Sequence, residues 1–279
     1  MSRVLIIGCG NIGGQLASLL KKEGHDVTGI KRTAPNVECD YSVKQLNVSD
    51  GEAVAAESFE YDQILYILSP NGGNIEAYHS VFDVGVDNVL KACKQQGSHA
   101  SITFVSSTRV YAQQQGEWVD EASNTEPEEE RGLYLLSAEN RFLSFNEKTT
   151  IVRFSGIYGR SNYFANQLKN GLPVQKEPAY YTNRIHRDDC IGVLHFILNK
   201  KIAGDNMSGV FVATDNDPAP KWDVGCYLAE LKGLNQPIPL VLDKNVKRNK
   251  RIRNKRIVNA GYLFKYPSYR QGYKVALDE

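Results

Sequence analysis

Strand-like and helix-like segments alternate through the first half of the chain. The short, largely apolar runs have the length of buried parallel strands and lie at residues 4–7, 26–32, 63–68, 102–106 and 151–154. Helical periodicity follows at residues 14–24, 77–96 and 132–147. Because strands and helices follow one another in turn, the pattern predicts an α/β fold with a doubly wound parallel sheet, in which ligands bind at the carboxyl ends of the strands.

A glycine-rich turn connects the first strand to the first helix. Gly8, Gly10 and Gly13 form a Gly-x-Gly-x-x-Gly pattern, with Asn11 and Ile12 between the last two. In a dinucleotide-binding unit the first glycine permits the tight turn, the second lets the backbone approach the pyrophosphate, and the third lets the helix pack on the strand. The helix N-terminus then offers free N–H groups to the phosphates. We therefore predict that these five residues bind a dinucleotide in a Rossmann-type fold; the alternative is a purely structural turn.

The end of the second strand indicates which dinucleotide binds. NAD-binding proteins usually place Asp or Glu there for the ribose 2′-hydroxyl, whereas an arginine accommodates the 2′-phosphate of NADP. This chain has Lys31 and Arg32, and no acidic residue lies between Val27 and Val37. A guanidinium can hold a phosphate through two hydrogen bonds. The sequence therefore favours NADP over NAD; the alternative is that both cations are simply solvated at a strand end.

The pattern is less regular after residue 154. Short helices are expected at residues 164–168, 191–198 and 222–231, and a strand at 210–213. We expect residues 1–155 to form the dinucleotide-binding domain. Residues 156–279 should form a smaller C-terminal substrate-binding portion, interleaved with the first and closing a pocket over the nicotinamide.

Composition argues against several classes of protein. The formal net charge is +1, so no overall field favours nucleic acid or a membrane surface. No apolar run is long enough to span a bilayer, and we expect no signal peptide because the chain enters a strand at once. The five cysteines are scattered without a Cys-x-x-Cys pair, which predicts no metal site and fits a reducing cytoplasm. Cys9, inside the glycine turn, is either oxidisable or a small filler side chain.

One segment, from Lys244 to Arg256, is strongly basic. Such a run can bind nucleic acid. No aromatic residue interrupts it, however, and the acidic stretch 126–130 carries the opposite charge elsewhere. We therefore expect a solvated face, or a contact with an anion at the edge of a pocket, rather than a nucleic-acid partner.

Three further segments resemble one family. They are the strand end Val105–Tyr111, the Arg-x-x-x-x-Tyr-Gly segment Val152–Gly159 and the Ile-His-x-Asp-Asp segment Asn183–Asp189. Together with the glycine turn, they make the chain resemble the extended short-chain dehydrogenases/reductases, the NAD(P)-dependent epimerase/dehydratase group. The C-terminal segments Asn254–Ile257 and Tyr266–Arg270 resemble an atypical branch of that group. The resemblance covers essentially the whole chain.

The resemblance implies roles for individual residues. In this group a Ser or Thr hydrogen-bonds the substrate oxygen, and a Tyr moves its proton while the nicotinamide gives or takes hydride. These roles fall on Ser107, Thr108 and Tyr134, which are our candidate catalytic residues. The resemblance adds further candidates for cofactor binding, namely Leu68, Ser69, Ser106, Phe154, Gly156 and Ile157.

The chain departs from the group where a Lys should follow the Tyr by four residues. A free Tyr titrates near pKa 10, so a base at neutral pH needs a nearby cation. Tyr134 has Ala138 at that position. If the Ala-Glu pair that normally follows the motif is aligned with Ala138 and Glu139, Arg131 takes the Tyr position and Leu135 the Lys position. Neither register supplies the lysine.

Alternatives therefore stay open at the predicted active site. Arg131 or Arg109 is the candidate for the missing cation. Ser107 contacts substrate or satisfies the backbone of a turn, and Tyr134 is a proton donor or an ordinary helix residue. His186 is expected to fix the start of a helix, with an Asp as its cap, rather than to act as an acid.

The sequence predicts an NADP-dependent oxidoreductase or epimerase/dehydratase-like enzyme with an altered catalytic pair. Its substrate would be a small carbonyl or hydroxyl compound, and by resemblance a sugar nucleotide is one candidate. The alternative is a catalytically inactive NADP-binding sensor or scaffold. We expect a cytoplasmic protein without nucleic-acid or membrane partners, and we allow for a homodimer.

Overall fold

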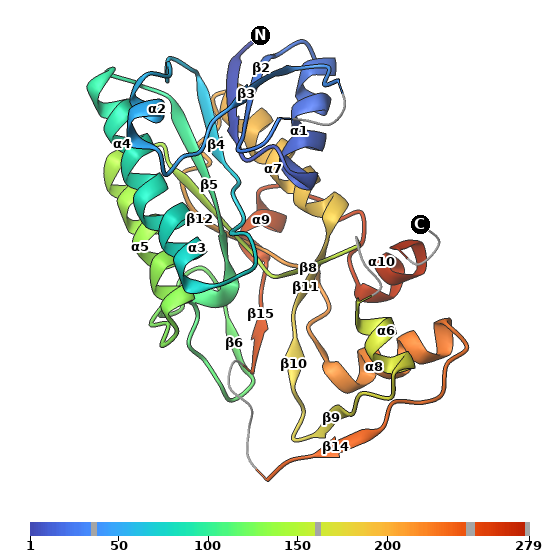
Figure 1. The fold of residues 1–279 in the computed structure, drawn as a ribbon. Helices are drawn as coiled ribbons and strands as arrows, with labels where there is room; N and C mark the ends of the chain where they lie inside the picture. Colours follow the sequence, from blue (N-terminus) through green and yellow to red (C-terminus); the bar gives the residue numbers. More distant parts are fainter. Residues whose placement is uncertain (35–37, 160–162, 244–248, 277–279) are drawn as a thin grey trace. The chain divides into compact units, whose positions relative to one another are not determined.

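A seven-stranded sheet is the framework of the computed structural model (Figure 1), which describes residues 1–34, 38–159, 163–243 and 249–276. The strands are β1 (Arg3–Ile7), β2 (Asp26–Lys31), β3 (Ser42–Gln45), β4 (Gln63–Tyr66), β5 (Ser101–Ser107), β7 (Thr150–Phe154) and β12 (Gly209–Ala213). Their order is β12-β7-β5-β4-β1-β2-β3, and β1 to β5 pair with their neighbours in parallel. The predicted Rossmann-type, doubly wound fold is confirmed.

The strand order reverses at the centre of the sheet. The chain runs from β1 outward through β2 to β3, and then returns to the other side of β1 with β4. In open α/β sheets a ligand crevice forms at such a switch point, outside the carboxyl ends of the strands. Here the switch point lies between Ile7, at the end of β1, and Tyr66, its partner in β4.

Helices cover both faces of the sheet (Figure 1). One face carries α1 (Asn11–Lys22) and α7 (Arg187–Ile202), and the other carries α2 (Gly51–Ala55), α3 (Ile75–His79), the π-helical turn η1 (Ser80–Val84), α4 (Gly85–Gln95) and α5 (Glu130–Phe145). The helix predicted at 77–96 is thus three consecutive segments, and it starts earlier because the Asn74 side chain accepts the Ala77 N–H at 3.0 Å.

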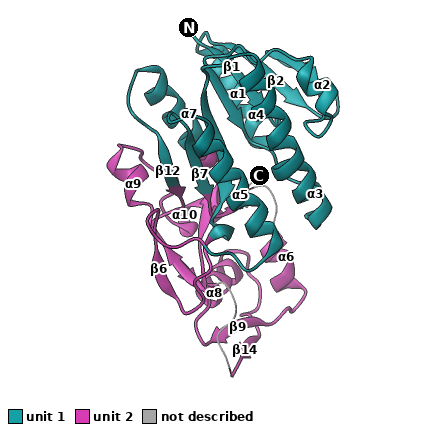
Figure 2. Cartoon of the chain, turned by 90° about the vertical axis from the view of Figure 1, so that its left-hand side faces the viewer, with its two compact units in different colours: residues 1–110, 126–153, 191–211 teal, residues 111–125, 154–190, 212–279 magenta. Residues whose placement is uncertain are grey.

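The chain divides into two compact units (Figure 2). Unit 1 consists of residues 1–110, 126–153 and 191–211, and unit 2 of residues 111–125, 154–190 and 212–279. The chain passes from one unit to the other five times. One of these passages lies between Arg153 and Phe154, where the sequence analysis placed a division after residue 155. Each unit is formed by three separate segments of the sequence, so the two units are interleaved along the chain.

Unit 2 is built from short elements. Its strands are β6 (Glu117–Val119), β8 (Gly156–Tyr158), β9 (Val174–Glu177), β10 (Tyr181–Thr182), β11 (Arg184–His186), β13 (Ala219–Pro220), β14 (Pro239–Val241) and β15 (Lys250–Ile252). Its helices are α6 (Tyr163–Lys169), α8 (Lys221–Leu231), α9 (Lys255–Asn259) and α10 (Tyr269–Ala276). A small core packs Val174 with Val224 and Leu228 of α8. The predicted helices near 164–168 and 222–231 are confirmed.

The basic run from Lys244 to Arg256 is only partly a solvated face. Residues 244–248 lie outside the described residues. Lys250 is buried and donates to the carbonyl of Tyr111 at 2.7 Å. The guanidinium of Arg251 lies 4.9 Å from the ring centroid of Trp118 and 4.8 Å from that of Tyr181. Aromatic residues absent from the run in sequence are therefore brought to it by β6 and β10.

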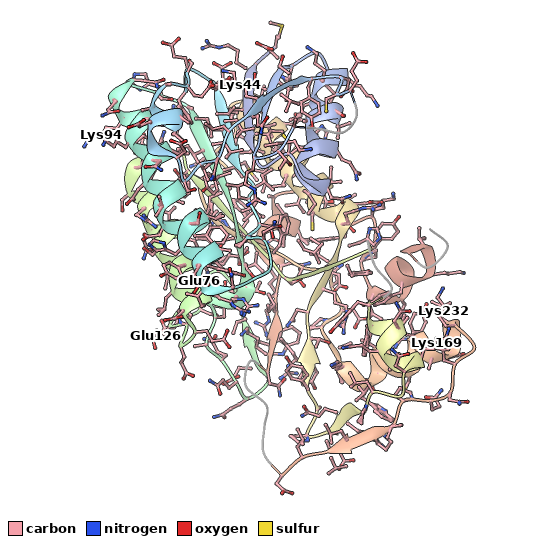
Figure 3. The ribbon with its side chains drawn as sticks, viewed as in Figure 1. Lys44, Glu76, Lys94, Glu126, Lys169 and Lys232 are labelled. Atoms are coloured by element: carbon pink, nitrogen blue, oxygen red, sulfur yellow. The ribbon has the colours of Figure 1, made fainter. Side chains whose placement is uncertain are left out.

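Charged side chains on the helices mark the solvent face, as Glu76, Lys94 and Lys169 show in Figure 3. Within the described ranges, no helix combines the length and the apolar character that crossing a membrane requires.

Lys201, in the last turn of α7, packs against neutral acceptors. Its ammonium donates to the carbonyl of Ile102 at 3.0 Å, and to the hydroxyls of Thr103 and Thr150 at 3.0 and 3.1 Å. Burial lowers the pKa of Lys201 from 10.5 to about 7. Between these two values the unfolded chain holds a proton on Lys201 that the folded chain lacks, so this group makes the free energy of unfolding rise with pH.

Replacing Lys201 by methionine, an unbranched apolar side chain, should remove this contribution. Urea unfolding of both proteins across the interval between the two pKa values should show the wild type gaining about 1.4 kcal/mol per pH unit relative to Lys201→Met. Parallel pH dependences of the two proteins would contradict the lowered pKa.

Candidate functional site

The three glycines of the turn after β1 have different physical requirements. Gly8 has φ +111°, and a Cβ there would lie 2.5 Å from the carbonyl oxygen of Ile67. A Cβ on Gly13 would lie 2.3 Å from the carbonyl oxygen of Gly8. A Cβ on Gly10 would meet nothing within 4 Å. Packing inside unit 1 therefore requires glycine at 8 and 13, whereas at Gly10 the backbone faces open space of the kind a pyrophosphate would fill.

Helix α1 starts directly at this open space. Gly10 is its N-cap and makes no side-chain capping bond, and its first turn contains no acidic residue. Asn11 is exposed and Ile12 half-buried. Because the first N–H groups of a helix have no intrahelical acceptor, this end presents donors and a positive dipole end to an anion. The arrangement fits a dinucleotide pyrophosphate.

The end of β2 places two cations near the glycine turn. Lys31 is half-buried and Arg32 is exposed. Burial raises the pKa of the Cys9 thiol to about 11, against the opposing effects of a Tyr41 hydrogen bond and the Lys31 charge. The backbone N–H groups of Gly8 and Cys9 donate to the carbonyl of Ile30 at 3.0 and 3.2 Å, so the end of β2 adjoins the turn. The Arg32 carbonyl accepts the side-chain amide of Gln45 at 3.3 Å.

The residues after β4 and β5 lie along the same edge of the sheet. Leu68 is beside the glycine turn, since a Cβ on Gly8 would lie 3.1 Å from its Cδ2 atom. Ser69 is exposed. Ser106 is buried, and its hydroxyl donates to Glu139 Oε1 at 2.5 Å. Parallel pairing of β4 with β1 and of β5 with β4 brings these strand ends to the switch point.

The predicted catalytic residues have separate neighbours within unit 1. Ser107 Oγ accepts the backbone N–H of Arg109 at 3.2 Å, which is the turn role weighed as the alternative. Thr108 begins the short 3₁₀ helix η2 (Thr108–Val110) and is half-buried. The Tyr134 ring meets the His79 ring edge-on at a centroid distance of 5.7 Å, so it faces α3. Their contact with a substrate stays a prediction.

The start of α5 carries no lysine. Glu139 is buried and pairs with Arg153 at 2.7 Å. In that register Leu135, which is 3% exposed, occupies the lysine position. Arg131 occupies the tyrosine position, and its guanidinium lies 5.9 Å from the centroid of Tyr78.

Arg109, the other candidate cation, already has an anionic partner. Its Nη1 atom lies 3.0 Å from Glu129 Oε2. Of the two arginines, Arg131 is therefore the better substitute for the missing lysine, because its guanidinium lies against the Tyr78 ring rather than a carboxylate. The sequence reasoning missed Tyr78; its place near the end of α3, against Arg131 in the first turn of α5, could not be inferred from spacing.

The candidate residues of unit 2 are the last residue of β7 and the first two residues of β8. Phe154 is buried, Gly156 is exposed and Ile157 is 48% exposed. Gly156 and Ile157 belong to β8, which pairs in parallel with β11 so that Ile157 lies opposite Ile185. A Cβ on Gly156 would lie 3.1 Å from the carbonyl of Asn183. Their role in cofactor binding stays a prediction.

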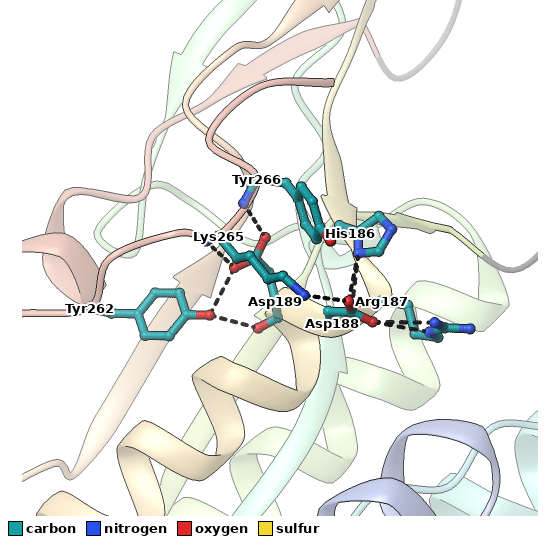
Figure 4. A network of polar contacts seen from close by, with 7 residues as sticks. All are labelled: His186, Arg187, Asp188, Asp189, Tyr262, Lys265 and Tyr266. Carbon is teal, nitrogen blue, oxygen red and sulfur yellow. Dashed lines mark hydrogen bonds and ion pairs between the residues drawn. The ribbon is translucent and has the colours of Figure 1, made fainter. Parts of the chain in front are cut away.

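The Ile-His-x-Asp-Asp segment ties the start of α7 to the C-terminal part of the chain (Figure 4). His186 is buried, and its Nδ1 accepts the Asp188 N–H at 3.2 Å. The carboxylate of Asp189 accepts the hydroxyl of Tyr262 at 2.9 Å and the backbone N–H groups of Lys265 and Tyr266 at 2.7 and 2.9 Å.

The expectation that His186 fixes the helix start is thus confirmed, but the expected Asp cap is wrong. The cap is the His186 ring, because both aspartates lie inside the first turn and Asp189 is used by residues 262–266. In the part of the chain that the structure describes, no three His, Cys, Asp or Glu side chains gather as metal ligands would.

Comparisons with known proteins agree with this geometry. Residues 4–205 match the profile of the NAD dependent epimerase/dehydratase family. No curated protein gives a significant match. Among solved structures, a Methylobacillus flagellatus protein described as an NAD-dependent epimerase/dehydratase is 30% identical, with a TM-score of 0.84 over 99% of this chain and 98% of that one.

Two further structures share the fold. A conserved Silicibacter pomeroyi protein of unknown function is 26% identical, with a TM-score of 0.75 over 100% of this chain and 99% of its own. The UDP-glucose 4-epimerase of Thermus thermophilus, solved with NAD, is 18% identical, with a TM-score of 0.79 over 99% and 98% of the two chains. At that identity the likeness shows the fold alone.

Proposed function

Because the chain belongs to the NAD-dependent epimerase/dehydratase family, we propose that it is an NADP-dependent oxidoreductase or epimerase/dehydratase-like enzyme. The observation that carries the proposal is the open space at Gly10, beside the uncapped start of α1 at the switch point of the sheet. Gly8, Gly13 and the first N–H groups of α1 would hold the pyrophosphate there.

The choice of NADP rests on Lys31 and Arg32. Arg32 is exposed at the strand end where a 2′-phosphate would bind, and the sequence has no acidic residue between Val27 and Val37 that would repel the phosphate. Lys31 ends the same strand, directly after Ile30, whose carbonyl accepts the backbone N–H groups of the glycine turn, and it adds a second positive charge. A guanidinium pairs with a phosphate through charge-assisted hydrogen bonds, so NADP should bind more tightly than NAD.

The bound nicotinamide would supply or accept hydride at a carbon that carries a carbonyl or hydroxyl oxygen. The residues of this chain would orient that oxygen and move its proton. Ser107, half-buried at the carboxyl end of β5, is the candidate donor to the oxygen. Tyr134 is the candidate proton carrier, and Arg131, next to Tyr78, offers a cation at the start of the same helix.

The substrate class is a small carbonyl or hydroxyl compound, and sugar nucleotides are among the candidates. The supporting observation for the latter is that the Thermus thermophilus UDP-glucose 4-epimerase has this fold.

A second candidate function is an NADP-binding sensor or scaffold without turnover. Ala138, buried four residues after Tyr134 where the family lysine would stand, favours it, because an apolar side chain cannot lower the pKa of the Tyr134 phenol. Screening NADPH oxidation with carbonyl substrates separates the two candidates. Turnover identifies an enzyme, and tight cofactor binding without turnover identifies a sensor.

The cofactor preference is tested by calorimetric titration with NADP⁺ and NAD⁺. Wild-type protein should bind NADP⁺ more tightly, and Arg32→Ala should lose about 1.5–3 kcal/mol of that preference, the worth of a hydrogen bond to a charged group. Lys22→Ala, at the opposite, exposed end of α1, is the matched control and should change nothing. Equal affinities of the wild type for both dinucleotides would refute the NADP assignment.

A further inference from the structure

A stack of arginine and aromatic side chains lies on the β6–β15 strand pair of unit 2 (Figure 1). The guanidinium carbon of Arg251 lies 4.9 Å from the ring centroid of Trp118 and 4.8 Å from that of Tyr181. The guanidinium carbon of Arg253 lies 4.9 Å from the same Trp118 centroid. All three distances are within the range of a cation–π contact. Two cations and two aromatic rings are therefore joined in one chain of contacts.

The backbone of β6 and β15 positions this stack. Trp118 is the partner of Arg251 in the parallel ladder, so the two side chains lie on the same face. The Arg253 N–H extends the ladder by donating to the Val119 carbonyl at 2.9 Å, and side chains two residues apart in a strand share a face. The Nε atom of Arg251 donates to the carbonyl of Gly116 at 2.7 Å, which holds the guanidinium beside the indole.

The two guanidinium charges have no counter-charge in the part of the chain that the structure describes. No Asp or Glu oxygen of those residues lies within the 4.0 Å of an ion pair with Arg251 or Arg253. Glu117 precedes Trp118 and therefore lies on the other face of the strand, where its Oε2 accepts the Gln115 N–H at 2.7 Å. Residues 249–256 include five Lys or Arg and no Asp or Glu. This face therefore carries positive charge that a polyanion can neutralise.

Solvent reaches part of the stack. Trp118 is 43% exposed and Arg253 is exposed, whereas Arg251 and Tyr181 are half-buried. The sequence analysis disfavoured a nucleic-acid partner because no aromatic residue interrupts the basic run. The fold removes that objection, since β6 and β10 bring an indole and a phenol ring to Arg251.

We propose that this face of β6 and β15 binds single-stranded nucleic acid through Trp118, Arg251 and Arg253. Unpaired bases stack on aromatic rings and on guanidinium planes, and a guanidinium holds a phosphate through its N–H fork. An acidic peptide would use the guanidinium groups and leave the indole without a partner. A membrane surface would need a free apolar ring to insert, whereas the Trp118 ring is in contact with two guanidinium groups. The proposal uses no residue of the glycine turn and does not rest on the proposed oxidoreductase function.

Fluorescence anisotropy of labelled oligouridylate and oligothymidylate, each of about 12 nucleotides, tests the proposal when they are titrated with the full-length protein. Saturable binding of both assigns single-stranded nucleic acid, and a tighter complex with one of them assigns RNA or DNA. The logarithm of the affinity should fall linearly with the logarithm of the salt concentration. Arg253→Gln should weaken binding about tenfold and reduce this slope by about 0.7, the contribution of one phosphate contact to a single strand.

Trp118→Ala tests the stacking of bases. It should weaken oligonucleotide binding about tenfold or more without changing the salt slope, and it should leave the binding of inorganic polyphosphate, which has no bases, unchanged. Trp118→Phe should restore most of the affinity, because a phenyl ring also stacks on bases. In Trp222→Phe, Trp118 is the only tryptophan, and its fluorescence should fall as the oligonucleotide saturates the protein.

Arg270→Gln is the matched control. Arg270 is an exposed arginine of α10 in the same unit, and its guanidinium carbon also lies near two rings, 5.2 Å from the centroid of Tyr227 and 4.9 Å from that of Tyr269. Because Arg270 lies outside the basic run, this variant should bind the oligonucleotides like the wild type.

Trp118→Ala is read together with its unfolding curve, and the exposed Arg253 carries the test. The proposal is overturned if neither oligonucleotide binds saturably, or if Arg253→Gln binds as tightly as Arg270→Gln. It is also overturned if folded Trp118→Ala binds oligonucleotide and polyphosphate like the wild type, because the face would then attract any polyanion by charge alone. Binding to anionic vesicles without binding to either oligonucleotide would assign a membrane surface instead.

Discussion

Gly10→Val should show no measurable heat of NADPH binding while its unfolding curve stays close to that of the wild type. The backbone at Gly10 has φ −79°, outside the left-handed region that favours glycine, and a Cβ there meets no atom within 4 Å. The valine side chain would instead fill the space next to the N-terminus of α1 that the pyrophosphate needs. Calorimetry and urea unfolding of the same preparation measure both effects.

Gly13→Ala is the matched contrast. Its Cβ would lie 2.3 Å from the carbonyl oxygen of Gly8, so this smaller substitution should destabilise unit 1 itself. If Gly10→Val binds NADPH like the wild type, or unfolds as early as Gly13→Ala, the glycine turn is not the pyrophosphate site.

Glu139→Ala should lower the free energy of unfolding by about 3–5 kcal/mol, because removing one partner leaves a buried charge uncompensated. Glu139 and Arg153 are 1% and 4% exposed, and two pairs of their atoms lie 2.7 and 3.1 Å apart. The hydroxyl of Ser106 would lose its acceptor as well. Urea unfolding measures the change.

Glu129→Ala is the control, since its partner Arg109 is partly exposed and such pairs contribute little. Its unfolding free energy should change by less than about 1 kcal/mol. Similar losses in the two variants would mean that the Glu139–Arg153 pair is not an essential part of the core.

The sheet of unit 1 could be predicted because its strands are buried on both faces. Run 4–7 is continuously apolar and run 151–154 is apolar except for Arg153, and both were identified within one residue of β1 and β7. The edge strand β3 was missed. Its four residues, Ser42–Gln45, are all half-buried or exposed and give no apolar run.

Unit 2 was less predictable because tertiary contacts define its elements. Strands such as β10 and β13 contain two residues each, too few to show a period. The role of stretch 111–125 depends on the parallel pairing of β6 with β15, whose residues are more than a hundred positions apart. No local pattern carries such information.

The part of the candidate site that depends on backbone geometry, the glycine turn, could be predicted from the sequence. The parts that depend on contacts between side chains of different helices could not. Glycine spacing identified the turn at Gly8, Gly10 and Gly13. The neighbours of Tyr134 and Arg131, on α3, depend on how two helices pack. The Glu139–Arg153 pair was missed although half of a signal existed: Arg153 is a charged residue in an otherwise apolar strand, and buried charges are normally paired.

Amide hydrogen exchange with and without saturating NADPH is the most direct test of whether NADP(H) binds at the glycine turn of unit 1. We expect bound NADPH to slow exchange at Gly8–Gly13, in the first turn of α1 and at Lys31–Arg32. Saturable NADPH binding that leaves exchange in all three segments unchanged would contradict it.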